Sequence, residues 1–306
     1  MWTICSEVNM ITTVDLHSHS THSDGLEDVT TMARRAHANG VRIWALTDHD
    51  SVEGWSEGRR AARSLGLRFV PGIEMTCEPA VEPQDAILRI RGLRPPSSWH
   101  LLAYFPDADD GTRRDLRSWL NDHAVNRGPR MQCMVDRLNE AGYAMSFEEV
   151  EAIAQGGQLG RPHLARAMVD RGYVPTVQAA FDDWLHDGGP ISVRAPLPTL
   201  QDAVDVVRAH DGVTSLAHPW YCGVDTEDLV GAVLDHGIDA IECYHSAHPP
   251  AFIEDLVACA TDRGIPSTVG GDSHGTESRP SPGGMGIPAE HLHPRFRPER
   301  QSLDAH

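Results

Sequence analysis

Residues 15–25 read Asp-Leu-His-Ser-His-Ser-Thr-His-Ser-Asp-Gly and follow a short apolar run at 11–14. An apolar run bounded by polar residues indicates a buried strand. Side chains two positions apart share one face of a strand, so His17 and His19 project together from its C-terminal end. Two imidazoles on one face can grip a metal ion, and Asp24 follows as a candidate oxygen ligand. The alternative is a polar turn that merely contains histidines, and ligands at similar positions downstream decide between the two.

The composition is acidic and rich in histidine. The chain has 306 residues, with 26 Lys and Arg against 44 Asp and Glu, a net charge of -18, and 18 histidines. This length accommodates one large α/β domain with a smaller inserted one. The charge argues against a protein that holds polyanions on a basic surface, so we expect no duplex DNA partner.

The six cysteines show no CxxC spacing, which favours core thiols in a reducing compartment over disulfides or a zinc knuckle. No apolar run approaches the length of a membrane span, and the first ten residues lack the features of a signal peptide. We therefore expect a soluble cytoplasmic protein with no membrane partner.

The first hundred residues alternate between short strands and helices. Strands are predicted at 41–46 and 68–75, and the helices between them at 28–39 and 52–65. This βαβαβ rhythm is typical of parallel strands with crossover helices. The second strand leads to His49 and the third contains Glu74. In a (β/α) barrel the carboxyl ends of the strands form the active site.

The middle of the chain departs from this rhythm. Residues 78–98 are polar and rich in proline, and we interpret them as a loop or small hairpin over the mouth of the site. A fourth strand at 99–104 carries His100. Residues 107–198 contain helical patterns but no strong strand, which predicts a helical insertion (cap) domain. Its helices are expected near 116–120, 131–138, 147–154, 164–171 and 181–185.

The barrel rhythm resumes after the insertion, with strands predicted at 213–217, 238–244 and 265–270. The first leads to His218 and the last to Asp272 and His274. The resulting division is a first barrel part at 11–106, the insertion at 107–198, a second barrel part at 199–290, and an irregular tail at 291–306.

Nine imidazole and carboxylate residues are thus expected at one end of the sheet, more than one metal ion can use. Imidazole with carboxylate suits zinc, manganese or iron. Two or three ions would share bridging carboxylates and a bridging water, lower the pKa of that water and clamp the oxygens of a phosphoryl displacement. The nine residues are His17, His19, Asp24, His49, Glu74, His100, His218, Asp272 and His274.

These residues stand in motifs that resemble those of the PHP (polymerase and histidinol phosphatase) family, and most closely its stand-alone nucleotide phosphatase branch. A GRPH motif at 160–163, inside the helical insertion, also resembles that branch. Two departures are a longer stretch before His100 and Gly271 where a serine is common. The other motifs are DLHSH at 15–19, TDHD at 47–50, GIE at 72–74, His100, AHP at 217–219 and DSHG at 272–275.

The resemblance implies a distorted (β/α)7 barrel of the PHP type that holds two or three divalent ions of manganese, zinc or iron. It also implies a grouping of the ligands. One ion would be held by His17, His19, Glu74 and Asp272. Glu74 would bridge to a second ion held with His100 and His218. A third would be held by Asp24, His49 and His274.

The insertion supplies four further candidates for the catalytic machinery. Arg161 and His163 stand at a predicted helix N-terminus, which attracts anions; the alternative is a plain helix cap. Arg127 and Arg130 could reach a second phosphate or the leaving side, which would make the insertion a substrate cap; the alternative is a solvated helix face.

Other polar residues near the motifs are expected outside the set of nine ligands. His22 faces away from His17 and His19 if strand alternation continues. Asp48 and Asp50 are expected to orient His49 or its neighbours. Four residues at the end of a barrel strand could line the pocket: Glu242, Tyr244, His245 and His248.

We therefore predict a metal-dependent phosphoesterase that hydrolyses a phosphomonoester of a small nucleotide, such as a nucleoside 3',5'-bisphosphate or AMP, by a metal-bridging hydroxide. The enzymatic alternative is a phosphodiesterase or 5'-3' exonuclease on short RNA or cyclic phosphates. The alternative from another class is a non-catalytic, metal-binding PHP module. The complete set of ligands argues against that last alternative.

Overall fold

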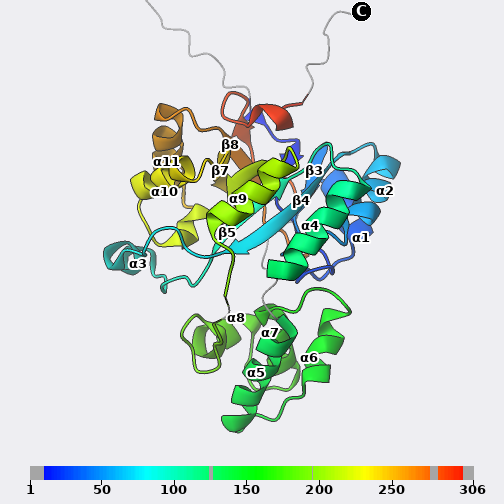
Figure 1. Ribbon diagram of the computed structural model, residues 1–306, viewed down its shortest axis with the longest axis vertical. Helices are drawn as coiled ribbons and strands as arrows, with labels where there is room; N and C mark the ends of the chain where they lie inside the picture. Colours follow the sequence, from blue (N-terminus) through cyan, green and yellow to red (C-terminus); the bar gives the residue numbers. More distant parts are fainter. Residues whose placement is uncertain (1–9, 124–126, 195, 276–281, 299–306) are drawn as a thin grey trace, which may run out of the picture.

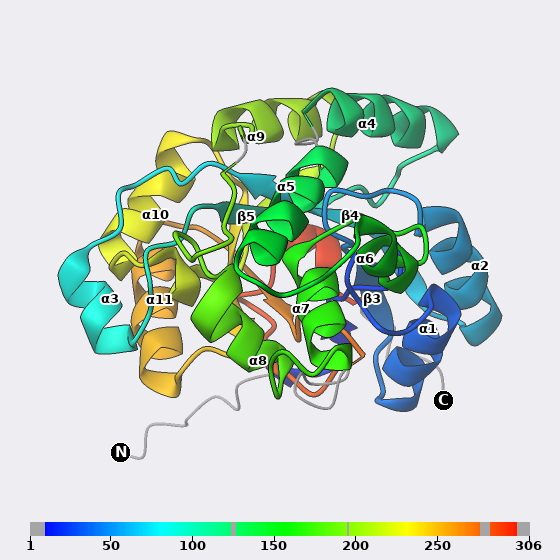
Figure 2. The ribbon, with the colours of Figure 1, turned by 90° about the horizontal axis from the view of Figure 1, so that it is seen from below.

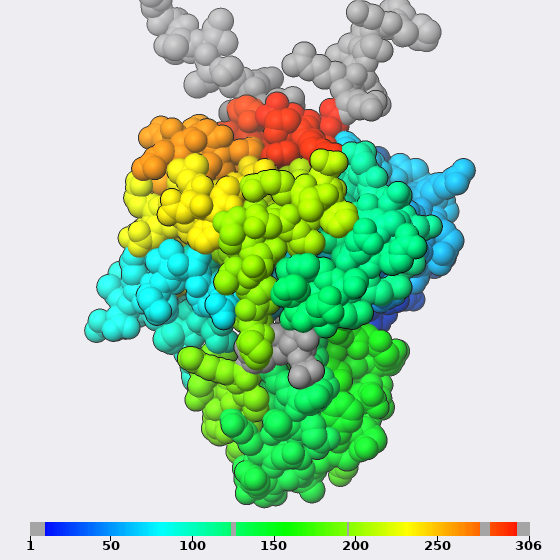
Figure 3. Space-filling model, in the orientation of Figure 1, coloured from blue at the N-terminus to red at the C-terminus, as the bar shows by residue number. Residues whose placement is uncertain are grey.

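The computed structural model describes residues 10–123, 127–194, 196–275 and 282–298. They form a curled seven-stranded sheet wrapped by helices, with a smaller helical lobe at one end of it (Figure 1). Figure 3 shows the two lobes in contact along that end. No helix within these residues is long and apolar enough to cross a membrane.

The sheet is an almost closed barrel. Its two edge strands approach each other, because the backbone N–H of Leu16 donates to the carbonyl of Val269 over 2.9 Å and Ser18 pairs with Ser273. The predicted distorted seven-stranded α/β barrel is therefore confirmed. In spatial order the strands are β2 (Val14–Asp15), β3 (Ile43–Leu46), β4 (Arg68–Cys77), β5 (Trp99–Tyr104), β6 (Val213–Leu216), β7 (Ala240–His245) and β8 (Ser267–Gly270).

One strand runs against the expected direction. β5 pairs antiparallel with both β4 and β6, whereas the other neighbours in the barrel pair parallel. His100 is the second residue of β5, so the start of this reversed strand lies beside the carboxyl end of β4, where Thr76 is its partner in register. The reversal thus leaves His100 at the same end of the barrel as the other candidates.

The segment before β5 also differs from its prediction as a loop or hairpin over the site mouth. It contains a helix, α3 (Asp85–Arg91), which ends at Gly92 in the left-handed conformation that glycine favours. This helix lies at the periphery of the barrel rather than across its mouth (Figure 2). Arg91 anchors it by donating to the carbonyl of Trp220 over 2.7 Å and by lying over that indole ring.

Amphipathic helices cover the outside of the barrel. Leu116 and Leu120 belong to the same core cluster as Leu101 and Phe105, so their helix packs with the barrel although it lies inside the predicted insertion range of 107–198. The limits of the insertion stay a prediction. The covering helices are α1 (Val29–Ala38), α2 (Trp55–Leu65), α4 (Asp110–His123), α9 (Leu200–Ala209), α10 (Thr226–Asp235) and α11 (Pro250–Asp262).

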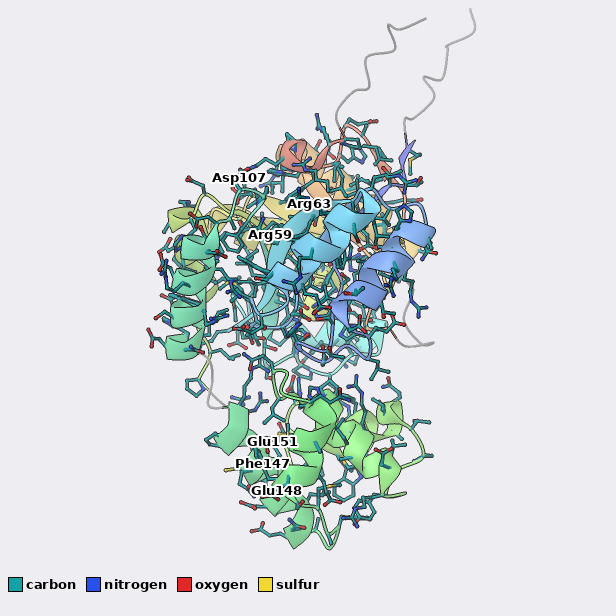
Figure 4. All side chains as sticks on the ribbon, turned by 90° about the vertical axis from the view of Figure 1, so that its right-hand side faces the viewer. Arg59, Arg63, Asp107, Phe147, Glu148 and Glu151 are labelled. Atoms are coloured by element: carbon teal, nitrogen blue, oxygen red, sulfur yellow. The ribbon has the colours of Figure 1, made fainter. Side chains whose placement is uncertain are left out.

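The helical lobe has a core of its own, which includes Met134, Leu138, Leu164 and Leu185. A reciprocal capping box between Ser146 and Glu149 begins one of its helices. Figure 4 shows Glu148 and Glu151 on this lobe, and Arg59 and Arg63 on α2 of the barrel lobe. The lobe consists of α5 (Arg127–Glu140), α6 (Phe147–Ala154), α7 (Arg161–Asp170), α8 (Val177–Ala180) and a π-helical turn, Phe181–Leu185.

The C-terminal segment seals the end of the barrel opposite the helical lobe (Figure 1). Ile287, Leu292 and Phe296 are fully buried in the barrel core. A short 310 helix, Pro294–Phe296, therefore stands where the sequence predicts an irregular tail. The run predicted as one strand at 11–14 is divided, because β1 (Met10–Ile11) pairs with β9 (Ile287–Pro288) while Val14 begins β2.

Candidate metal centre

All nine predicted ligand residues lie together at the barrel end that faces the helical lobe. Loops that follow β2, β3, β6 and β8 supply most of them, whereas Glu74 lies within β4 and His100 near the start of β5. The local fold brings them together because these loops leave the barrel at one end. They are His17, His19, Asp24, His49, Glu74, His100, His218, Asp272 and His274.

Glu74 occupies the middle of this group and is almost fully buried. Its Oε1 lies 2.6 Å from Nδ1 of His100 and 2.7 Å from Nε2 of His218. These two imidazoles approach the same carboxylate oxygen, His100 from β5 and His218 from the turn that follows β6. Their arrangement matches a set of ligands that share one bridging carboxylate.

The other oxygen of Glu74 faces three more imidazoles. Its Oε2 lies 2.9 Å from Nε2 of His19, 3.1 Å from Nε2 of His17 and 3.3 Å from Nδ1 of His49. Glu74 therefore contacts imidazoles on both sides of its carboxylate, and its removal would affect every part of the group.

Two aspartates complete the arrangement. Oδ1 of Asp272 lies 3.2 Å from Nε2 of His19 and 3.5 Å from Nε2 of His17. Oδ1 of Asp24 lies 3.3 Å from Nε2 of His274. The two carboxylates thus flank His19, one on the Glu74 side and one on the His274 side.

Three sets of donor atoms lie within 4.8 Å of one another inside this group. The four residues predicted to hold the first ion form one set. The three residues predicted to hold the third ion form another set, which also includes His19. In the remaining set Glu74 and His100 lie with His49, whereas the prediction grouped them with His218. Proximity identifies the donors, and their assignment to particular ions stays a prediction. The sets are His17, His19, Glu74 and Asp272; His19, Asp24, His49 and His274; and His49, Glu74 and His100.

The electrostatics of the group fit a bound divalent ion. Burial opposes charge on His19, but the carboxylates of Asp272 and Glu74 outweigh it and raise its pKa to about 10. Burial likewise opposes charge on Glu74, but the imidazoles around it, His100 and His17 among them, hold its pKa well below the usual value. Buried carboxylates at this density need cations beside them, either protons on the imidazoles or metal ions in their place.

The unpaired nitrogens of His19 and the neutral ring of His49 also fit a bound metal ion. Both ring nitrogens of His19 are buried and neither makes a hydrogen bond, although Nε2 lies close to Glu74. Burial lowers the pKa of His49 to about 3, which keeps its ring neutral and able to coordinate. Unsatisfied imidazole nitrogens that face carboxylates are the donors that manganese, zinc or iron would use.

The backbone is strained at two of the nine residues and at Asp50, which follows His49. Asp50, His218 and Asp272 adopt positive φ angles of 45°, 25° and 51°. Such conformations cost about 1–3 kcal/mol each in non-glycine residues and concentrate at functional sites.

Comparison with known proteins agrees with this centre. The model of the PHP domain family matches residues 15–185, more than half of the chain. The chain belongs to the PHP family. PHP proteins of this kind are metal-dependent phosphoesterases, so the chain is a hydrolase of phosphoric esters with clusters able to bind metal.

Two relatives and one solved structure show how far the similarity extends. A 5'-3' exoribonuclease of Haemophilus influenzae is 27% identical over 263 residues, which are 85% of this chain and 89% of the relative. A 3',5'-nucleoside bisphosphate phosphatase of Chromobacterium violaceum is 27% identical over 299 residues, 95% and 96% of the two chains. The structure of a Chromobacterium violaceum protein described as an amidohydrolase, with bound sulfate and no metal, superposes with a TM-score of 0.78 at 26% identity and covers 94% of both chains.

The helical lobe contributes a pocket of arginines beside the PHP barrel. Arg127, Arg130 and Arg161 line this arginine pocket together with Met131 and Leu159. Arg127 pairs with Asp50, the residue after the candidate ligand His49. The ion pair connects the pocket directly to the rim of the metal centre.

The three arginines differ in how they are neutralised. Arg127 pairs with Asp50, and Nη1 of Arg161 lies 2.6 Å from Oδ1 of Asp187. Arg130 donates from Nε to the carbonyl of Val193 over 2.8 Å, and within the described part of the chain no carboxylate pairs with it. Burial, reinforced by Arg161 and Arg127, lowers the pKa of Arg130 to about 10, so it keeps its charge at neutral pH.

His163 makes the contact expected of a helix cap. Its Nδ1 accepts a hydrogen bond from the backbone N–H of Gly160 over 3.0 Å at the start of α7. The ring is buried at 1% exposure, which favours the helix-cap interpretation over direct contact with a substrate. Burial and the nearby Arg166 lower its pKa.

Arg166 makes a contact that the sequence did not predict. It reaches from α7 to donate to the backbone carbonyl of Asp24, and Gln158 N–H donates to the carbonyl of His22 over 3.1 Å. Together they fasten the helical lobe to the loop that carries Asp24. A lone arginine in a helix gives no sequence signal of such a role.

Three other residues predicted near the PHP centre, Asp48, Asp50 and His22, make contacts with residues outside the nine. Oδ1 of Asp48 accepts from Ser20 N–H over 2.7 Å, which holds the loop after β2, and Oδ1 of Asp50 accepts from Thr76 N–H over 2.8 Å. His22 points away from the centre, as expected, with Nε2 3.7 Å from Oε2 of Glu57.

Proposed function

We propose that this PHP protein hydrolyses a phosphomonoester of a small nucleotide, and that its preferred substrates carry a second phosphate, as a nucleoside 3',5'-bisphosphate does. AMP, with a single phosphate, would be a poorer substrate. The observation that carries this proposal is the arginine pocket fastened to the rim of the metal centre through Arg127 and Asp50. A centre for the reacting phosphate and a separate cationic pocket match a ligand with two anionic groups.

The metal centre would hold two or three ions of manganese, zinc or iron. The residues that would hold them are the nine predicted ligands, with Glu74 shared among them. Bound ions of this type neutralise developing charge on phosphate oxygens and favour deprotonation of an attacking water.

The protein's own residues would bind and orient the substrate. Of the three arginines that line the pocket, Arg130 is the one that forms no ion pair with a described carboxylate, so it is the pocket cation most available to a second phosphate. Charge-assisted hydrogen bonds to phosphate are about twice as strong as neutral ones. The helical lobe covers the mouth of the barrel (Figure 2), which would limit the size of substrate that enters.

A phosphodiesterase or 5'-3' exonuclease acting on short RNA or cyclic phosphates is the second candidate. It is favoured by the Haemophilus influenzae relative, which bears that name and aligns over 89% of its length. The same nine donors would serve a diester, so the two candidates differ in what the helical lobe admits. A non-catalytic metal-binding module is disfavoured because all nine predicted ligand residues lie together.

The test is a comparison of substrates by the Mn²⁺-loaded protein. Phosphate release is measured from nucleoside 3',5'-bisphosphates, monophosphates and cyclic phosphates, and from short 5'-phosphorylated RNA. The proposal expects the highest kcat/KM for a bisphosphate. Faster turnover of the RNA would replace it with the exonuclease, and bound metal without turnover of any substrate would leave the non-catalytic module. A cytoplasmic location stays a prediction.

A further inference from the structure

β7 is the one barrel strand that supplies none of the nine predicted ligands. It nevertheless places two ionisable side chains against them, Glu242 and His245, both with 0% exposure. We propose that Glu242 and His245 are positioning residues, which hold the ligands His17, His218 and Asp272 in the geometry that binds metal. The inference rests on the metal centre of the proposed function.

An irregularity in β7 makes this placement possible. From Ile241 to Tyr244 the strand advances three residues, while its partner β8 advances two, from Ser267 to Val269. The extra residue is a β-bulge, which re-aims side chains and recurs beside active sites. Regular alternation would put Glu242 and His245 on opposite faces of the sheet. The bulge turns both toward the metal centre.

Glu242 contacts two of the ligands at once. Its Oε1 lies 3.0 Å from Nδ1 of His17, and its Oε2 accepts from the backbone N–H of His218 over 2.7 Å. A carboxylate on one nitrogen of an imidazole fixes the tautomer and leaves the other nitrogen for the metal. For His17 that other nitrogen is Nε2, which faces Glu74 and Asp272. The second contact supports His218 in its strained backbone conformation.

His245 lies close to Glu242 and contacts a different candidate ligand, Asp272. Its Nδ1 accepts from the backbone N–H of Ala247 over 3.1 Å, so a neutral ring carries its proton on Nε2. That buried nitrogen has no hydrogen-bond partner and lies 3.7 Å from Oδ2 of Asp272. Oδ1 of the same carboxylate faces His17 and His19, so a donor at Oδ2 would fix which oxygen turns to the ion.

The neighbouring side chains show that this role is specific to these two. The hydroxyl of Tyr244 lies 2.7 Å from Nδ1 of His291 in the C-terminal segment, and His248 donates to the carbonyl of Cys243 over 3.0 Å. Of the four residues predicted to line the pocket, only Glu242 and His245 make a carboxylate–imidazole contact with a predicted ligand among the described residues, at 3.0 Å from His17 and 3.7 Å from Asp272.

The experiment measures the affinity of the metal-free, full-length protein for Mn²⁺ by calorimetric titration. Glu242→Gln is expected to weaken binding by about 10–100-fold, the range found when such orienting partners are lost. His245→Leu should weaken it as well, and His245→Gln should restore most of the affinity because it keeps a donor near the position of Nε2. Asp239→Asn is the control, since Asp239 is bound to Thr214 just before β7 and touches no ligand.

A merely structural role would lower the melting temperature of the metal-free protein and leave the Mn²⁺ affinity unchanged. Affinity of Glu242→Gln within about threefold of wild type would overturn the proposal. So would the loss of one whole equivalent of Mn²⁺ with the rest bound normally, because Glu242 would then be a ligand itself. Failure of the proposed function looks different: the wild type would bind Mn²⁺ and release no phosphate.

Discussion

Oε1 of Glu74 lies 2.6 Å from Nδ1 of His100, across the antiparallel pair that β4 forms with β5. In register His100 stands opposite Thr76, two residues beyond Glu74 on the same face of β4. A strand of reversed direction therefore still delivers its imidazole to the shared carboxylate. Because the other oxygen of Glu74 faces His19 and His17, this one residue joins the parts of the centre.

The first prediction follows from that position. Glu74→Gln should lower both Mn²⁺ content and phosphate release by more than about 100-fold, beyond the loss expected for a residue that only orients a ligand. The amide removes the negative charge and can no longer accept from imidazoles on both sides. Metal analysis after dialysis and a phosphate-release assay measure the two effects. Glu78→Gln is the control, because Glu78 is exposed and lies directly after β4. Normal metal content in Glu74→Gln would sink the assignment.

The second prediction concerns pH. In the metal-free protein burial opposes charge on His19, but Asp272 and Glu74 raise its pKa to about 10. A raised histidine pKa contributes stability that is complete below about pH 6.5, the pKa of an unfolded histidine, and is lost as the pH rises toward 10. The free energy of unfolding of the metal-free protein should therefore fall over that window.

Mn²⁺ must displace this proton, so its affinity should rise by about tenfold per pH unit over the same window for each proton released. Calorimetric titration in two buffers of different ionisation enthalpy counts the protons. His19→Gln should release fewer, whereas His22→Gln should match the wild type because His22 points to Glu57 instead. Binding without proton release would contradict the prediction.

That the nine candidate ligands lie together could be predicted, because their positions follow from local pattern. Short apolar runs that lead to His, Asp or Glu mark strand ends, and parallel strands gather those ends at one side. The direction of β5 could not be predicted in this way, since alternation from Trp99 to Tyr104 looks the same in either direction. The roles of Glu242 and His245 depend on a bulge set by pairing with β8, which no local pattern contains.

Packing partners are the other feature that the sequence does not specify. The apolar positions of α4 predict a helix with one buried face but not which core it enters, and Leu116 and Leu120 join the barrel. Phe296 lies in a stretch rich in proline and arginine that has no periodic pattern, yet it is fully buried at the base of the barrel. In both cases tertiary contacts decide what local propensity leaves open.

The third prediction tests the arginine pocket. Arg130→Met should raise KM for a nucleoside 3',5'-bisphosphate by about 10–100-fold, which corresponds to the roughly 1.5–3 kcal/mol of a hydrogen bond to a charged group. KM for a monophosphate should change little, because the second phosphate is absent. Arg137→Met is the matched control, on the same helix and bound to the carbonyl of Ser192. Equal effects of Arg130→Met on both substrates would exclude a second-phosphate site at this arginine.

The last prediction concerns closure of the barrel beside the centre. A Cβ at Gly270 would lie 2.3 Å from Cβ of His17 and 2.9 Å from Oε1 of Glu242, where β8 approaches the chain after β2. Gly270→Ala should therefore cost about 1–3 kcal/mol of unfolding free energy, as overpacked cores do, and should weaken Mn²⁺ binding by displacing His17. Gly231→Ala is the control, since a Cβ there meets open space in α10 and should stabilise the helix by about 0.5–1 kcal/mol. Urea unfolding of the metal-free variants gives both values. A Gly270→Ala protein as stable as the wild type would show that His17 and Glu242 can move apart without loss, and the close approach of β8 would then not be what fixes their distance.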